Sequence, residues 1–160
     1  MIHPDLVEAQ RLIKRLGREC PQPTPEADNV EYGAAIAISG RASIRFRVGK
    51  LTPTKVGLFV AVWRRSADGG TEPFPADHAS ADDADTLVIS VREGAKSGHF
   101  VFPLSALISH GIVSVGGSGG KRGFRVYPPW SLTSSRQARK TQEWQCAYFH
   151  DSNDIGLPAS

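Results

Sequence analysis

The sequence predicts one mixed α/β domain, a central β-sheet flanked by helices, and three observations support this fold class. A chain of 160 residues suits a single hydrophobic core. Hydrophobic residues make up 40% and charged residues 22%, the balance of a globular protein. Segments with helical periodicity are interspersed with segments of period two, which places helices against a sheet.

The N-terminal part is expected to form a helix, a linker and two strands. Apolar residues recur at helical spacing over residues 4–17, and Leu16 closes their stripe before Gly17 ends the helix. Three prolines make residues 18–30 a linker. Strands are expected over residues 33–39 and 42–48. In the second strand Arg45 and Arg47 alternate with apolar residues, which predicts that both arginines point away from the core.

The remaining elements follow in order. Residues 49–55 form a basic loop, and the apolar run 57–65 predicts a strand buried on both faces. Residues 66–84 form a surface excursion. An antiparallel pair is expected over 86–91 and 99–102, then a short helix from Pro103 to about His110. A strand over 124–127 and a helix over 133–149 complete a domain that spans residues 1–150. Residues 151–160 are expected to be a frayed tail.

The net charge is only +3, but the charge is unevenly distributed. Residues 41–65 contain seven basic side chains and no acidic one, and residues 100–140 contain six and again no acidic one. Residues 66–99 contain seven acids. Such segregation concentrates positive potential on part of the surface. Two interpretations stay open, namely a solvated basic face and a binding site for phosphates.

Three segments carry most of this charge. Residues 46–55 place a glycine and two lysines in one turn, where backbone N–H groups can face an anion. Residues 119–130 combine a glycine arm, three cations and three aromatic residues, which suits phosphate contact and base stacking. Trp130 has a second interpretation, as a plug of the core. Arg136 and Lys140 share one face of the last predicted helix.

Signals for catalysis, metals and membranes are weak. The two cysteines, 20 and 146, predict reduced structural thiols. The five histidines have no metal-binding spacing. No apolar run is long enough for a membrane span, and the start lacks the pattern of a secretory signal, so a cytoplasmic location is expected. The candidate catalytic acid is Glu72, because its segment, residues 70–74, has the composition of a defined local structure.

Several motifs in one order resemble the MepB family. They are Tyr-Gly-Ala at 32–34, the run from Phe46 through Trp63 to Arg65, Thr-Glu-Pro-Phe at 71–74, residues 98–103, residues 121–130 and residues 140–145. The resemblance covers roughly residues 30–150 and implies a core similar to that of restriction endonucleases. Such nucleases usually carry an acid on the second core strand and Glu-x-Lys on the third. Arg45, Arg47 and Ala61-Val62-Trp63 stand there instead, so the resemblance implies a nucleic-acid-binding shape and speaks against cleavage.

The resulting prediction is a non-catalytic domain that binds nucleic acid, DNA rather than RNA on the analogy of fold. The residues expected to contact phosphates are Arg45, Arg47, Lys50, Lys55, Arg64, Lys121, Arg122, Arg125, Arg136 and Lys140. The residues expected to stack on bases are Trp63, Tyr127 and Trp130. No metal or cofactor is expected.

Two alternatives stay open beside this prediction. One is a Mg²⁺-dependent nuclease or other hydrolase with a site around Glu72, Lys50, Lys55 and Glu31. The other is a module for a small anion, a nucleotide or a protein partner. A homodimer also stays open.

Overall fold

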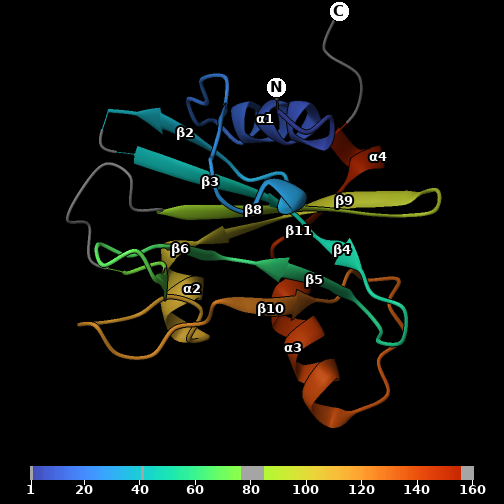
Figure 1. Cartoon of the computed structure of the whole chain (residues 1–160). Helices are drawn as coiled ribbons and strands as arrows, with labels where there is room; N and C mark the ends of the chain where they lie inside the picture. The colour runs from blue at the N-terminus through green and yellow to red at the C-terminus, as the bar shows by residue number, and fades with distance from the viewer. Residues whose placement is uncertain (1, 41, 77–84, 156–160) are drawn as a thin grey trace, which may run out of the picture.

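The computed structural model of the chain describes residues 2–40, 42–76 and 85–155. Its largest sheet has six strands in the order β1–β2–β3–β8–β9–β11 (Figure 1). Their bounds are Thr24–Pro25, Ala35–Ser39, Ala42–Val48, Thr86–Glu93, Lys96–Pro103 and Phe149–Asp151. β3 and β8 run parallel, and every other neighbouring pair is antiparallel. The mixed sheet with its helices confirms the predicted fold class.

Helix α1 (Asp5–Arg15) covers one face of this sheet. Its stripe of Leu6, Ala9 and Ile13 packs against Ile44 and Phe46 of β3, which buries both surfaces from water. The predicted helix is confirmed, but its stripe ends earlier than expected. Leu16 caps the helix and is 47% exposed.

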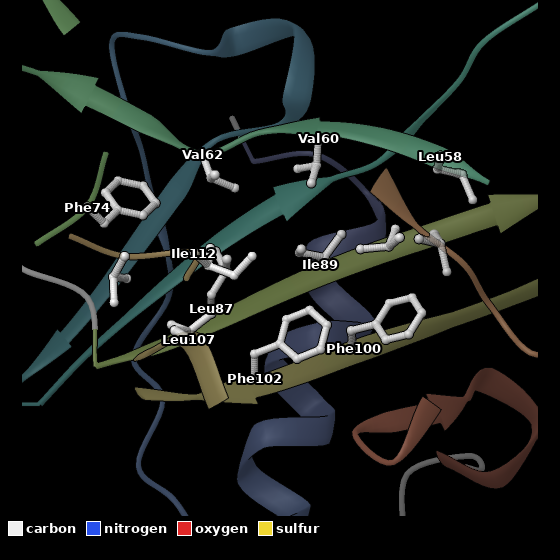
Figure 2. Packing of buried hydrophobic residues seen from close by; sticks show 13 residues of the cluster. Leu58, Val60, Val62, Phe74, Leu87, Ile89, Phe100, Phe102, Leu107 and Ile112 are labelled. Carbon is white, nitrogen blue, oxygen red and sulfur yellow. The ribbon is translucent and has the colours of Figure 1, made fainter. Parts of the chain in front are cut away.

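The other face of the sheet carries a second layer of short strands and helices (Figure 1). β5 (Leu58–Ala61) pairs with β4 (Lys50–Leu51) and β10 (Gly123–Val126), while β6 (Trp63–Arg65) pairs with β7 (Thr71–Pro73). Helices α2 (Leu104–Ser109) and α3 (Arg136–Cys146) lie on this side. Figure 2 shows side chains of β5 pointing toward Ile89 and Phe100 of the central sheet, so the main core lies between the two layers.

Two predicted elements differ from the structure in the middle of the chain. The single strand expected over 57–65 is wrong, because the chain leaves one sheet after Ala61 and enters another at Trp63. The excursion expected over 66–84 contains β7, which pairs with β6 to form a hairpin. Residues 77–84 of that excursion lie outside the described residues.

The C-terminal part is more ordered than the sequence suggests. α3 is shorter than predicted, because the Ser135 hydroxyl accepts a hydrogen bond from the Ala138 N–H and caps the helix. Phe149 belongs to β11, and α4 (Ser152–Ile155) follows it. The expectation of a frayed tail from residue 151 is therefore wrong as far as Ile155, which is buried. Residues 156–160 lie outside the description.

The linker expected over 18–30 and the expected hairpin are close to what the structure has. The linker contains only the two-residue strand β1 and leads into a 3-10 turn, η1 (Val30–Tyr32). The hairpin of β8 and β9 extends the predicted pair at both ends. Both cysteines are free thiols, and burial raises the pKa of Cys20 and of Cys146, so neither is a reactive thiolate at neutral pH. Over the described ranges, no helix is both long and apolar enough to cross a membrane.

Candidate nucleic-acid interface

The outer face of the three-stranded sheet brings together cations from both basic blocks. Arg125 of β10 and Lys50 of β4 each lie opposite Phe59 of β5. Residues opposite each other in neighbouring strands share a face, so these three side chains form one row across the sheet. The adjacent residues Val60 and Val126 are fully buried in the core, and the row therefore projects outward. We call Lys50, Phe59 and Arg125 the outer row.

Aromatic rings are interleaved with these cations. The Lys50 ammonium lies 4.9 Å from the centroid of the Tyr32 ring, and that ring meets Phe59 edge to face at 6.2 Å. The Phe59 ring occupies the space that a side chain at Gly123 would need. Burial raises the pKa of Tyr32, with the Glu31 carboxylate adding to the rise, so the phenol stays a neutral hydrogen-bond donor. The outer row thus combines positive charge with half-buried aromatic rings.

Arg125 also fixes the loop that follows β4. Its guanidinium donates from Nη2 to Thr52 Oγ1 at 2.7 Å and from Nη1 to the Val56 carbonyl at 3.3 Å. The loop returns to β5 at Gly57, whose φ of +85° favours glycine and whose missing side chain leaves room for the Tyr127 ring. Lys55, at the tip, is exposed. The structure therefore places Lys55 in a loop that Arg125 of the outer row holds, where Lys55 lines a depression with Trp130.

The Lys121-Arg122 pair divides between two roles. Arg122 donates from Nε to Thr71 Oγ1 at 3.1 Å and from Nη2 to the Thr71 carbonyl at 3.0 Å, which joins β7 to the segment before β10. Lys121 is exposed, and its backbone N–H is bonded to the Ile112 carbonyl. Of this pair, Arg122 is therefore held by Thr71, and Lys121 is the exposed cation with no side-chain contact of this kind among the described residues.

Arg45 and Arg47 do not lie on a solvent face, and the prediction that they point outward is wrong. Arg45 is 6% exposed and Arg47 is fully buried. Both meet Glu26, with Arg47 Nη1 at 2.7 Å from Oε1 and Arg45 Nη1 at 3.3 Å from Oε2. Both guanidinium groups also lie over the Phe74 ring. Arg47 is not accessible to a phosphate, and Arg45 reaches only the lining of the depression beside β6, next to Glu26.

Arg45 and Arg47 are buried because the second layer covers their face of β3. Alternation in β3 separates two faces correctly, but it carries no information about what covers the second face. β5 covers this one, and the Ala61 carbonyl accepts from Arg47 Nε at 3.0 Å. The two arginines and Glu26 are thus a structural charge cluster between the layers.

Arg64 lines a depression of about 380 Å³ beside β6 and β7, together with Trp63. Nearby carboxylates neutralise much of the positive charge of this depression. Arg64 Nε donates to Glu72 Oε1 at 2.9 Å, and Arg65 pairs with Asp28 at 2.9 Å, a hydrogen bond that lowers the pKa of Asp28. The Trp63 ring lies under the Arg65 guanidinium. This depression has mixed charge, so it suits a polyanion less well than the outer row does.

Helix α3 lies along the free edge of β10. Gln145 accepts from the Tyr127 N–H at 2.8 Å and donates to the Arg125 carbonyl at 2.9 Å, as a neighbouring strand would. Arg136 and Lys140 are exposed on this helix. Trp130 donates to Glu93 and packs edge to face against Phe149 at the border of the core, which fits its interpretation as a plug.

The residues of the alternative hydrolytic site are not gathered in one place. Glu72 lines the depression beside β6, whereas Lys55 lines another beside Trp130. Lys50 lies on the outer row, and Glu31 is exposed in η1. Among the described residues, no three His, Cys, Asp or Glu side chains gather as metal ligands would.

A buried polar network was not predicted from the sequence. Glu8 of α1 accepts from His99 Nε2 at 2.6 Å and from Ser152 Oγ at 2.8 Å. Because the carboxylate only accepts, the neutral His99 ring accepts at Nδ1 from Ser90 Oγ, 2.8 Å away. The order Ser–His–Glu is that of a hydrolase triad. Ser90 is only 1% exposed under α1, so it offers no nucleophile to a substrate, and the network is structural.

Fold and surface together define a mixed α/β domain with a cationic, aromatic outer sheet face. A family model described as MepB-like matches residues 26–151, and the chain belongs to that family. A solved structure, the crystal structure of MepB, superposes with a TM-score of 0.76 at 32% sequence identity, over 96% of this chain and 99% of the other. A search of curated proteins finds no match.

Proposed function

We propose that the protein binds nucleic acid on the outer row and does not cleave it. The observation that carries the proposal is the alignment of Arg125, Phe59 and Lys50 in one row, with cations from two distant blocks on either side of a ring. Cations on either side of a ring can contact the phosphates of a bound strand, and the ring between them can stack on a base of any type. Lys55 and Lys121 extend the surface.

The nucleic acid we propose is DNA, because the resemblance implies a core like that of restriction endonucleases. That analogy concerns the fold and remains part of the proposal, as does a cytoplasmic location. The half-buried rings of Phe59 and Tyr32 at this face favour strands whose bases are unpaired, since paired bases keep their faces inside the duplex. No metal or cofactor takes part in the proposed binding.

The first test is fluorescence anisotropy with labelled single-stranded and double-stranded oligonucleotides at two salt concentrations. Affinity should fall steeply as salt rises, because each neutralised phosphate releases counterions. Lys50→Ala should weaken binding and reduce the slope of log affinity against log salt by about 1. Lys14→Ala is the matched control, since Lys14 is exposed on α1 across the central sheet. Equal losses in both variants, or affinity indifferent to salt, would contradict the proposal.

Phe59→Leu separates stacking from charge. Leucine keeps an apolar side chain over Gly123 but has no π-face, so affinity for a single strand should fall by about five-fold or more. The salt slope should stay unchanged, because no charge is removed. A variant that binds a single strand as tightly as the parent would remove the aromatic part of the proposal.

Cleavage is tested separately with labelled DNA and RNA in Mg²⁺ or Mn²⁺. Both substrates should stay intact over the time in which binding is complete. Cleavage that disappears in Glu72→Gln would instead establish the hydrolytic alternative.

A further inference from the structure

Two adjoining depressions along α3 share the lining residues His110, Gln137, Thr141 and Trp144. The first, of about 420 Å³, lies between α3 and β10 and is also lined by Lys121 and Arg125. The second, of about 900 Å³, extends along the helix past Arg136 and Lys140. Volumes of this order accommodate a small organic ligand.

An aromatic stack forms the shared wall. The rings of His110 and Trp144 are parallel within 4°, with centroids 3.8 Å apart. Phe102, 5.3 Å from the indole, anchors Trp144 to the core. His110 is an exposed residue just after α2, so the stack is accessible from solvent. A flat heterocycle can extend such a stack.

The rim is positively charged. Lys121, Arg136 and Lys140 are exposed, and within the described ranges none of them forms an ion pair. Glu143 is the single carboxylate among the residues that line the two depressions. The amide of Gln137 and the hydroxyl of Thr141 can exchange hydrogen bonds with the edge of a heterocycle. A planar ligand with a phosphate is complementary to all of these groups.

We propose that this cavity binds one nucleotide, whose base extends the His110–Trp144 stack and whose phosphate pairs with the rim cations. The nucleotide is either free in solution or part of a strand. Arg125 belongs both to the outer row and to the lining of the cavity, so a strand on the outer row passes its mouth. Binding of a nucleotide within a strand rests on the proposed function, whereas binding of a free nucleotide does not.

The experiment is a calorimetric titration with AMP, with inorganic phosphate as the comparison. AMP should bind saturably and more tightly than phosphate. His110→Ala removes the exposed half of the stack and should weaken AMP by about five-fold or more. Arg139→Ala is the control, because Arg139 is exposed on α3 but lines neither depression. Trp144→Phe keeps a ring against Phe102 and should give a smaller loss than His110→Ala.

Oligonucleotides that carry one abasic position distinguish the two sources. If the intact oligonucleotide binds more tightly than the abasic one, and His110→Ala removes the difference, the site holds a base of a bound strand. If AMP binds but no oligonucleotide does, the cavity stands and the proposed function fails. The inference is overturned if AMP does not saturate and the intact and abasic oligonucleotides bind alike. Equal losses in His110→Ala and Arg139→Ala would overturn it as well.

Discussion

Glu26 holds two buried cations at once. Arg47 is fully buried and Arg45 nearly so, and their positive charges meet this carboxylate between the two layers. Removing a charge from a buried ion cluster leaves the remaining charges without compensation, which costs far more than the cluster contributes when intact.

Glu26→Gln should therefore destabilise the protein by about 3 kcal/mol or more. Glutamine keeps the size of the side chain and a hydrogen-bond acceptor, so the loss reports the charge. The free energy of unfolding is measured in urea at neutral pH. Glu31→Gln, a nearby exposed position, should change stability by less than about 0.5 kcal/mol. Similar effects in both variants would show that Glu26 does not compensate the arginines.

At the residue scale, the sequence predicted the exposed cations better than the aromatic residues. Lys50, Lys55 and Lys121 are exposed as charged loop or edge residues usually are. Phe59 was missed, because an apolar residue in a strand is assigned to the core by default, and Tyr32 was missed because it lies in a 3-10 turn outside every expected strand. The outward position of Phe59 depends on which strands pair with β5, and periodicity within one strand does not contain that information.

At the element scale, the junction of α3 with β10 depends on one side chain. Gln145 is fully buried and satisfies the backbone carbonyl of Arg125 in β10 and the backbone N–H of Tyr127 just after it. Gln145→Ala should destabilise the protein by about 2 kcal/mol, since it leaves two backbone groups without their partners. Thermal unfolding followed by circular dichroism measures the loss. Gln137→Ala, exposed on the same helix, is the control, and an equal shift of Tm in both would contradict the assigned role.

Long elements were predicted, and so were the short helix α2 and strand β10, whereas the three-residue strands were not. The β8–β9 hairpin and α1 carry enough residues for a clear periodicity, and both are present. β7 and β11 have three residues each, so their own sequences contain no usable pattern. β7 exists because β6 offers it an edge, and β11 exists because β9 does. Such strands are determined by tertiary contacts.

At the scale of the whole molecule, the His99 network couples stability to pH. Burial lowers the pKa of His99, although hydrogen bonding to Glu8 opposes the shift, and burial also lowers the pKa of His150. The unfolded chain then binds more protons than the folded one below about pH 6.5. Stability should be full above that pH and should fall as pH decreases.

The pH dependence is measured by urea unfolding between pH 5 and pH 8. His99→Gln should reduce the slope and leave the part that His150 contributes. Ser97→Ala removes a hydroxyl bonded to Ser152 in the same network but no titrating group, so it should leave the slope unchanged. If His99→Gln has the full slope of the parent, the network does not carry the dependence.

The segregation of charge along the chain predicted part of the surface. Cations of the two blocks converge at the outer row, yet Arg45 and Arg47 turn inward and Arg64 pairs with an acid of the excursion. The number of basic residues in a sequence segment does not reveal which of them form ion pairs inside the folded protein. That distinction requires the arrangement of the two layers.

The hydrogen bond between Ser152 and Glu8 joins residues 144 positions apart, and β11 adds the outermost strand of the sheet beside β9. On the ribosome, α1 emerges long before the segments that complete its network. The network is therefore completed only after residue 152 has left the exit tunnel, and the high contact order of this closure favours slow folding.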